Sequence, residues 1–266
     1  MQKIIDCHCH IYPDKIAARA AEAIGAFYGI EIDHDGTLAT LLRVSDEAGV
    51  DHTVVCSVAT TPEQVSGINR YLSKTVSENS SRLAGIGTLH PASTHLQEDF
   101  NQLCQLGLLG VKLHPDFQKF ALDDPLCMNI YELCQQKNMP ILLHTGDKRY
   151  DFSNPDRLNH ILAAFPHVRF IGAHLGGWSV WDQASQQLRR HDNLYVDTSS
   201  ALYALKPERA AQMIRHYGAD RVLFGTDYPM WTPSDELKRF EALNLTCVEQ
   251  ESILYQNAID LFGLPF

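Results

Sequence analysis

Lys3-Ile4-Ile5-Asp6-Cys7-His8-Cys9-His10 begins as an apolar run and ends in two histidines one residue apart. Its isoleucines favour a buried β-strand. Because side chains alternate across a strand, Asp6, His8 and His10 are expected to share one face, opposite the two cysteines. Two imidazoles on one face of a strand can bind a single metal ion from the same side. This stretch therefore predicts both the first element of a sheet and half of a metal site.

Seven more apolar runs follow, and several lack alternation, which is typical of parallel strands covered on both faces. We expect strands at residues 3–8, 53–58, 83–89, 110–114, 140–144, 169–174, 194–197 and 222–226. Amphipathic patterns, several of them starting with proline or a Ser, Thr or Asp cap, predict helices at residues 37–48, 62–79, 95–106, 125–138, 155–165, 178–191, 207–217, 233–242 and 247–262. Eight strand–helix alternations predict an α/β fold, a (β/α)8 TIM barrel forming one domain over residues 1–266. An open doubly wound sheet is disfavoured because no Gly-x-Gly-x-x-Gly follows the first strand.

The connection after the first strand is longer than a barrel crossover needs. Residues 11–35 contain Tyr12, Phe27 and Tyr28, and we expect them to form a short helical insertion over the mouth of the barrel. Such an insertion can act as a capping helix, as a substrate-binding lid, or as both.

Composition excludes several classes of protein. The net charge is −10 and the basic residues are dispersed, which argues against a nucleic-acid partner. No apolar stretch approaches the ~20 residues of a membrane span, and the N-terminus does not read as a signal peptide. The 7 cysteines are scattered without a Cys-x-x-Cys pair, so we expect a reduced, cytoplasmic protein.

Three further strands end in metal-ligand or acid–base side chains. His144 follows Pro140-Ile141-Leu142-Leu143, while His174 and Asp227 end two later strands in the same way. A parallel barrel gathers the carboxyl ends of its strands at one mouth, so these side chains are expected to converge with the first two histidines. The pattern predicts a metal-dependent enzyme.

These residues carry a family resemblance that spans essentially the whole chain. His-x-His after strand one, histidines after strands five and six and aspartate after strand eight resemble the amidohydrolase superfamily. More narrowly, the chain resembles the amidohydrolase-related group, which holds hydrolases and non-oxidative decarboxylases, the aminocarboxymuconate-semialdehyde decarboxylases among them. The motifs that carry this resemblance are Gly110-Val111-Lys112-Leu113-His114-Pro115, His174-Leu175-Gly176-Gly177, Gly225-Thr226-Asp227-Tyr228-Pro229 and Asn257-Ala258-Ile259-Asp260-Leu261-Phe262.

The resemblance implies a division of roles in the site. His8, His10, His144 and Asp227 would bind one Zn²⁺, and His174 would stand beside it as an electrophilic or acid–base residue. Asp227 could also take a proton from metal-bound water, whose pKa falls to about 7 on catalytic zinc. Another divalent metal, or a binuclear site, is left open.

Lys112 and His114 share a face of the fourth strand by two-residue alternation. In superfamily members with two metals, a carboxylated lysine on this strand often bridges the ions. The alternative, which we favour, is that Lys112 and His114 orient the substrate or a neighbouring loop.

Tyr12, Trp178 and Arg149 are candidate substrate-binding residues around the mouth. Trp178 can equally anchor the helix that follows it, and Arg149 can be a solvated loop charge instead of the partner of a substrate carboxylate. Asp197, at the end of the seventh strand, is expected to support a ligand histidine.

Three functions remain open on the sequence. We favour, narrowly, a hydrolase in which metal-activated water attacks the carbonyl of a lactone, amide or ester of a small, acidic substrate. The alternatives are a zinc-dependent decarboxylase of an aromatic or unsaturated acid and a non-catalytic metal-binding barrel. The expected partner is a small molecule, and pairing of copies through outer helices is left open.

Overall fold

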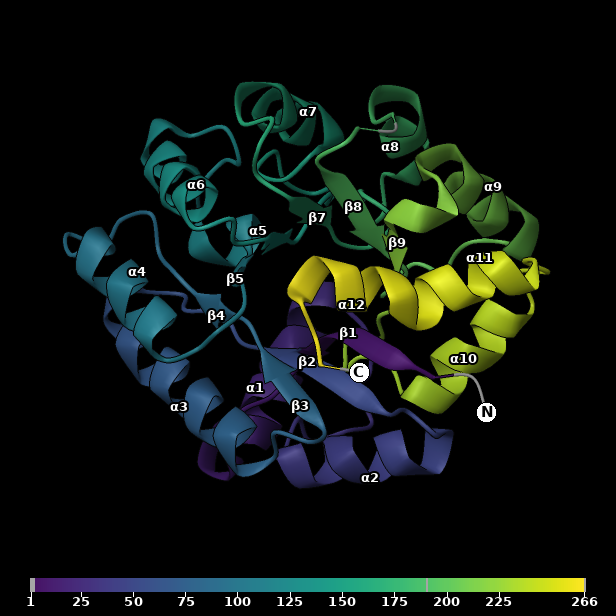
Figure 1. Cartoon of the computed structure of the whole chain (residues 1–266), viewed down its shortest axis with the longest axis horizontal. Helices are drawn as coiled ribbons and strands as arrows, with labels where there is room; N and C mark the ends of the chain where they lie inside the picture. The colour runs from purple at the N-terminus through teal and green to yellow at the C-terminus, as the bar shows by residue number, and fades with distance from the viewer. Residues whose placement is uncertain (1–2, 190, 266) are drawn as a thin grey trace.

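The computed structural model describes residues 3–189 and 191–265, and within them eight parallel strands form a closed barrel (Figure 1). The barrel predicted from the sequence is confirmed. Its strands are β1 (Ile5–His10), β2 (His52–Cys56), β3 (Leu83–Gly85) with β4 (Gly87–Thr88), β5 (Val111–Leu113), β6 (Ile141–Leu143), β7 (Phe170–Gly172), β8 (Leu194–Asp197) and β9 (Val222–Leu223). Residue 190, inside the helix expected at 178–191, and the ends of the range 1–266 lie outside the described residues.

The expected third strand is broken at Ile86. Leu83–Gly85 pairs with β2, whereas Gly87–Thr88 pairs with β5. At the break, the Ile86 amide donates to the Val55 carbonyl at 3.0 Å and the next amide, of Gly87, donates to Gly110 at 2.9 Å. The strand thus pairs with β2 before the break and with β5 after it, and this change of partner lets the sheet curve into a barrel.

Hydrogen bonds between the first and last strands close the barrel. The Cys7 amide donates to the Phe224 carbonyl at 2.9 Å, and the Asp227 amide donates to the His8 carbonyl at 2.8 Å. The His10 amide donates to the Tyr228 carbonyl at 2.7 Å. Closure therefore brings the His-x-His segment beside Asp227, although 217 or more residues of chain separate them.

Helices pack outside the barrel, and most begin where proline or a side-chain cap predicts. They are α1 (Asp14–Tyr28), α2 (Leu38–Ala48), α3 (Val65–Glu78), α4 (Leu96–Gln105), α5 (Pro115–Gln118), α6 (Pro125–Gln136), α7 (Pro155–Ala164), α8 (Trp181–Gln187), α9 (Pro207–Tyr217), α10 (Pro233–Glu241), α11 (Cys247–Glu251) and α12 (Asn257–Phe262). Short 3₁₀ turns span Pro62–Gln64 and Ala219–Arg221, and a π-helical turn spans Ser252–Gln256. Thr246 and Glu249 form a reciprocal capping box at the start of α11.

Helix α8 begins three residues later than the expected 178–191. Ser179 has a φ of +61°, in the left-handed region, so the segment before Trp181 turns instead of continuing a helix. Trp178 therefore lies in the loop after β7.

Strand β1 departs from strict alternation. Its register with β2 shifts between Asp6 and Cys9, so a bulge lies in the histidine segment. Cys7 joins Ile5 in the barrel interior, whereas the Asp6 carboxylate accepts a 2.7 Å hydrogen bond from the Thr226 hydroxyl. The expectation that Asp6 shares a face with both histidines is therefore wrong, because one extra residue at the bulge lets His8 and His10 converge without it.

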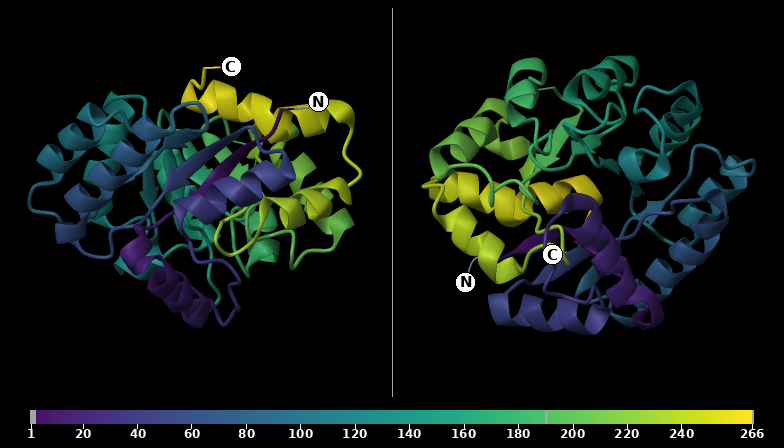
Figure 2. Two further views of the ribbon diagram at one scale, coloured as in Figure 1. Left: turned by 90° about the horizontal axis from the view of Figure 1, so that it is seen from below. Right: turned by 180° about the vertical axis from the view of Figure 1, so that it is seen from behind.

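Different helices cover the two ends of the barrel. Ala258, Leu261 and Phe262 of α12 pack against interior residues such as Ile5 and Leu142, at the end where strands begin. Helix α1, the expected insertion, lies at the opposite end (Figure 2). The site must therefore be reached past α1.

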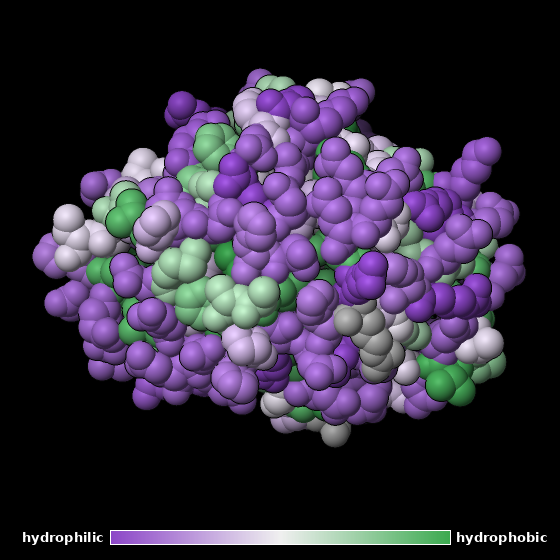
Figure 3. All heavy atoms as spheres, turned by 90° about the horizontal axis from the view of Figure 1, so that it is seen from above, coloured by the Kyte–Doolittle hydropathy of each residue, from purple (hydrophilic) through white to green (hydrophobic). Residues whose placement is uncertain are grey.

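Among the described residues, the large hydrophobic side chains that are exposed are Ile16, Leu126 and Val248. In the face shown in Figure 3, hydrophilic residues dominate and apolar residues form small groups. Among the described residues, no helix combines the length and apolar character required to cross a membrane.

Candidate metal centre and its cavity

Three of the expected ligands meet at the mouth of the barrel. The Nε2 atoms of His8 and His10 lie 3.2 Å apart, and Asp227 Oδ1 lies 3.4 Å from each of them. A tetrahedral ion with bonds of about 2.0–2.1 Å needs donor atoms about 3.3 Å apart. Two imidazole nitrogens and a carboxylate oxygen are donors that suit zinc, manganese and similar divalent ions. The three donors thus fit such an ion in both spacing and chemistry.

His8 is held in the tautomer that a metal ligand needs. Its Nδ1 lies 2.9 Å from Asp197 Oδ2, and Ser199 Oγ donates to the other oxygen of Asp197. A carboxylate cannot donate, so Nδ1 carries the hydrogen and the lone pair on Nε2 faces the cluster. The side chain of Asp197 therefore lies where the sequence suggested a supporting carboxylate.

His144 is placed differently from the other three expected ligands. Its Nδ1 lies 3.1 Å from Nε2 of His174, and its Nε2 lies 3.6 Å from Oδ2 of Asp116. Its ring stacks on His114 at a centroid distance of 4.0 Å. Among the described residues, no hydrogen bond or ion pair joins His144 to the three-donor cluster. The geometry therefore supports a ligand role for His8, His10 and Asp227 more directly than for His144.

His174 stands beside the cluster, as the sequence suggested. Its ring stacks on His8 at 5.5 Å, and its Nδ1 lies 2.8 Å from the Ser199 carbonyl oxygen. That carbonyl can only accept, so Nδ1 donates and Nε2 of the neutral ring accepts from His144. His174 is thus oriented on both sides and faces the cavity.

Two residues of the site have backbone conformations that residues other than glycine rarely adopt. His174 and Asp227 have φ values of +61° and +62°, in the left-handed region. Such conformations cost of order 1–3 kcal/mol and persist only where surrounding contacts hold them. Hydrogen bonds from the His174 amide to Asp197 Oδ1 (2.9 Å) and from the Asp227 amide to the His8 carbonyl (2.8 Å) do so here.

Lys112 and His114 both face the cavity, in agreement with their two-residue spacing. Lys112 is 1% exposed, and its Nζ lies 3.0 Å from Nε2 of His8. His114 Nε2 lies 2.8 Å from the Tyr28 hydroxyl, and its Nδ1 accepts from the Phe117 amide at 3.3 Å. Lys112 therefore reaches the cluster, whereas both nitrogens of His114 already have partners.

The electrostatics of the site favour an ionised Asp227 beside neutral His114 and His144. At His10, burial would lower the pKa, but Cys56 and Asp227 raise it to about 9. Burial lowers the pKa of His114 and His144 well below the usual value, and the neighbouring cations lower it further. Burial also lowers the pKa of Lys112. For Asp227, burial alone would raise the pKa, but the charges of His8, His10 and His174 hold it well below its usual range.

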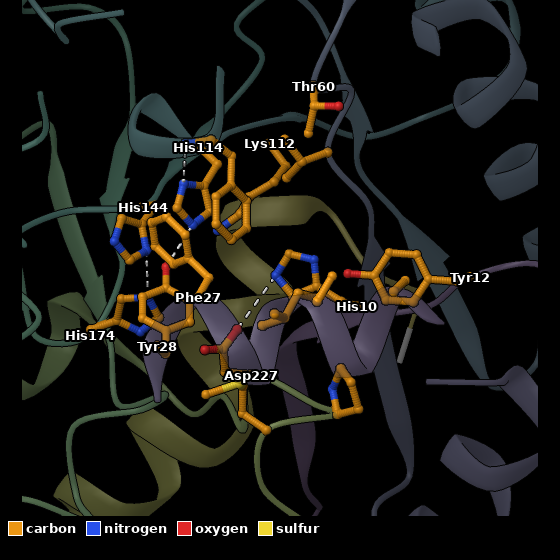
Figure 4. Close-up of a pocket in the computed structure, with 17 residues that line it drawn as sticks. His10, Tyr12, Phe27, Tyr28, Thr60, Lys112, His114, His144, His174 and Asp227 are labelled. Atoms are coloured by element: carbon orange, nitrogen blue, oxygen red, sulfur yellow. Dashed lines mark hydrogen bonds and ion pairs between the residues drawn. The ribbon is translucent and has the colours of Figure 1, made fainter. Parts of the chain in front are cut away.

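A cavity of about 310 Å³ lies over these residues (Figure 4). Its polar end holds His10, His174, Lys112 and Asp227, while its remaining wall is mainly apolar. The wall is lined by Tyr12, Ala20, Ala23, Ile24, Phe27, Tyr28, Val58, Thr60, Phe117, Pro229 and Met230. Tyr12, a predicted substrate-binding residue, does line the cavity.

Arg149 is not among the residues that line the cavity, and its contact with a substrate carboxylate stays a prediction. Its Nη2 lies 2.6 Å from Oδ2 of Asp147, and its Nη1 donates to the Phe27 carbonyl at 2.5 Å. Its guanidinium also lies 4.6 Å from the centre of the Phe27 ring. The guanidinium of Arg149 thus binds partners within the protein and connects the end of α1 to the loop after β6.

Trp178 is buried behind the cavity wall. Its ring packs edge-on against Tyr28 at 4.9 Å, and it is not among the residues that line the cavity. Of the two alternatives for Trp178, the structure favours the packing role.

Sequence reasoning missed three residues near the site. Asp116 is buried beside His144, Phe117 stacks on His114 at 3.8 Å, and Cys56 Sγ lies 3.7 Å from Nδ1 of His10. Cys56 ends β2 and obeys the strand-end rule that located the histidines, so that rule could have found it. Asp116 and Phe117 lie on the short helix α5, which no periodicity signals.

Comparison with known proteins places the chain in a family. The amidohydrolase family model matches residues 5–264. A curated relative from Dictyostelium discoideum, named 2-amino-3-carboxymuconate-6-semialdehyde decarboxylase, is 30% identical in an alignment of 243 residues that covers 74% of this chain and 66% of that protein. The chain therefore matches just under two thirds of the length of this relative.

Solved structures share the fold. An uncharacterised TIM-barrel protein from Bordetella bronchiseptica is 21% identical, with a TM-score of 0.77 over 98% of this chain and 99% of that chain. A dihydroxybenzoic acid decarboxylase from Polaromonas sp. JS666, with bound manganese and 2-nitroresorcinol, is 18% identical, with a TM-score of 0.72 over 99% of this chain and 98% of that chain. At these identities the likeness concerns the barrel itself.

Proposed function

This chain belongs to the amidohydrolase family, and from that membership we propose that it is a metal-dependent decarboxylase of a small aromatic or unsaturated acid. Sequence alone placed hydrolysis narrowly first. The decarboxylase activity named for the curated relative, and the manganese-bound decarboxylase that shares the fold, move decarboxylation ahead of it. Hydrolysis of a lactone, amide or ester is the alternative that the experiment below tests.

The observation that carries the proposal is the polarity of the cavity. Its metal-binding and cationic groups gather at one end, while the rest of its wall offers mainly carbon atoms. Loss of carbon dioxide removes the strongly hydrated carboxylate group, so a weakly hydrated surrounding favours that change. An apolar wall beside a carboxylate-binding end suits this reaction.

His8, His10 and Asp227 would hold one divalent ion, with His144 as the further donor that the resemblance implies. When bound, the ion supplies positive charge that binds and polarises substrate oxygens. Zinc was expected from the sequence, and manganese is the ion bound in the Polaromonas enzyme.

Lys112 would bind the substrate's anionic oxygen, because its ammonium group lies beside the metal-binding nitrogen of His8. Burial lowers the pKa of Lys112, and a negatively charged substrate beside it would favour its charged form. In this role Lys112 is a substrate ligand and not a bridge between two metals.

His174 would deliver the proton that replaces carbon dioxide. As the bond between the ring carbon and the carboxylate breaks, its electron pair stays on that carbon, which must then gain a proton. The Nδ1 proton of His174 is held by Ser199, so the transferred proton would leave from Nε2. The neutral ring carries no hydrogen on Nε2, so His174 would first take up a proton from water at that nitrogen, and His144, whose Nδ1 lies 3.1 Å from it, would orient the ring.

The test is a parallel assay of two substrate panels with metal-loaded protein. Carbon dioxide release is measured with hydroxybenzoates and unsaturated acids, and ring or bond opening is measured with lactones, esters and amides. We expect release of carbon dioxide, lost by 10²-fold or more in His174→Asn with metal content unchanged. Turnover confined to the lactone, ester and amide panel would replace the proposal by hydrolysis.

A further inference from the structure

The cavity over the metal-binding residues continues into a second hollow. A groove of about 450 Å³ lies between α1 and α3, and four of its lining residues also line the cavity: Tyr12, Ala20, Val58 and Thr60. In Figure 4 the Tyr12 hydroxyl points toward His10. The ring of Tyr12 thus lies where the polar site and the groove meet.

Helix α1 connects the two hollows by one apolar stripe. Ile16, Ala20, Ala23, Ile24 and Phe27 follow helical spacing, and each lines the cavity, the groove or both. A different face of α1, with Ala17, Ala21 and Gly25, is the one buried in the protein. The stripe is therefore an apolar helix face left available to a ligand along its length.

The groove offers little to a polar ligand. The Ser57 hydroxyl donates to the Ile11 carbonyl, and the Gln64 side-chain oxygen accepts from both the amide and the hydroxyl of Thr60. No charged residue is among those that line the groove in the described parts of the chain. Ile16, in its wall, is 51% exposed, which is unusual for a large aliphatic side chain.

We infer that the groove is a binding subsite for an apolar substituent of the substrate, an alkyl or aryl group on the side of the ring remote from its carboxylate. This inference rests on the proposed function, since it takes the acid end to lie at Lys112. Continuity with the cavity favours this occupant, because a ligand whose acid end lies at the polar site would reach the groove past the four shared residues, Tyr12, Ala20, Val58 and Thr60. The substrate class is then an amphiphilic aromatic acid.

The test measures binding of benzoate and its 4-alkyl derivatives, from methyl to hexyl, by calorimetry. Each methylene transferred from water to an apolar groove contributes about 0.8 kcal/mol, which is about four-fold in affinity. We expect affinity to rise by this factor per carbon over part of the series and then level off. Equal affinity of benzoate and 4-hexylbenzoate would overturn the inference.

A groove-filling variant locates the effect. Gly67, on α3, lines the groove, and a Cβ at this position meets no atom within 4 Å. Gly67→Leu should fill the space without strain, since glycine is itself unfavourable within a helix. We expect it to weaken 4-hexylbenzoate by 10-fold or more, as roughly two methylenes of contact are lost, and to leave benzoate unchanged.

Lys74→Leu is the matched control, because it adds the same side chain to α3 at a position whose side chain is 74% exposed. It should bind both acids like the parent protein. A loss that is equal for both acids in Gly67→Leu, or equal in both variants, would contradict a subsite at the groove.

Binding and turnover separate the two proposals. If affinity rises with alkyl chain length but no carbon dioxide is released, the apolar subsite is supported and the decarboxylase proposal is wrong. If carbon dioxide is released but affinity does not rise with alkyl chain length, the decarboxylase proposal is supported and the apolar subsite is wrong. Absence of binding by every member, 4-hexylbenzoate included, would also overturn the inference, because the added carbons would then gain no contact with the groove.

Discussion

Asp197 Oδ2 lies 2.9 Å from Nδ1 of His8, and this contact joins strand β8 to strand β1 inside the site. The Asp197 carboxylate fixes the imidazole so that its other nitrogen faces Asp227. Loss of a carboxylate that supports a metal-binding histidine typically lowers metal affinity by 10–100-fold. We therefore expect Asp197→Asn to weaken the binding of zinc or manganese by that factor, measured by competition with a chromogenic chelator.

Asp182→Asn is the control for this prediction, because the side chain of Asp182 is 88% exposed and pairs with Arg209 on the surface. It should leave metal affinity unchanged. Equal affinity in Asp197→Asn and the parent protein, with both folded, would contradict a role of the Asp197 charge in metal binding.

The ammonium group of Lys112 lies 3.0 Å from Nε2 of His8, close enough to act on a substrate or on a metal. If Lys112 binds substrate, Lys112→Met should keep about one metal ion per chain and lose about 10²–10³-fold in kcat/KM. Elemental analysis together with the carbon dioxide assay measures both. A fall from two ions to one would instead identify Lys112 as a bridge, and the exposed Lys137→Met is the control.

Gly146, in the loop after β6, has a φ of +78°, and a Cβ on it would lie 2.6 Å from backbone atoms of Gly177. Backbone cannot move aside as a flexible side chain can. We expect Gly146→Ala to lower the free energy of unfolding by about 3 kcal/mol, measured by urea denaturation. Gly107→Ala separates the two causes, since Gly107 shares the conformation, with a φ of +71°, but has open space around it. It should cost only about 1 kcal/mol.

Glu236 is fully buried on α10, and its Oε2 has no hydrogen-bond partner among the described residues. Burial raises its pKa to about 8 from 4.5, with Asp6 and Asp227 adding to the shift and Arg239 opposing it. The folded state therefore holds a proton that the unfolded chain releases above pH 4.5. The stability that this proton contributes is complete below that pH and is lost as pH rises toward 8.

Glu236→Gln should remove this loss, so the difference in unfolding free energy between pH 5.5 and pH 8 should shrink by up to about 1.4 kcal/mol per pH unit. Urea denaturation at both pH values measures it. Glu241→Gln, at an exposed position of the same helix, should keep the slope of the parent protein. An unchanged slope in Glu236→Gln would mean that Glu236 is ionised in the fold at pH 5.5.

The barrel and its mouth could be predicted because both follow from strand ends. His8, His174 and Asp227 each follow an apolar run, and parallel strands bring their carboxyl ends together whatever the exact strand length. The observed strands are mostly shorter than expected. The side chains still meet, because the parallel direction of the strands, and not their length, brings their carboxyl ends to one side of the barrel.

The contacts of individual side chains could not be predicted in this way. The bulge in β1 turns Asp6 from the site, and no feature of an alternating run of Asp, Cys and His signals it. Arg149 donates hydrogen bonds to the Asp147 carboxylate and to the Phe27 carbonyl, and Phe27 is 122 residues away in sequence. His144 faces His174 and Asp116 because of stacking on His114, a contact between strand ends that local sequence does not encode.

Strand β1 begins and helix α12 ends on the side of the barrel away from α1 (Figure 2). A tag, a fusion partner or a solid support joined at either end would therefore sit behind the closed end. The substrate entrance would face the solution in every attached molecule, so an immobilised layer of this enzyme would be uniformly oriented without engineering of its surface.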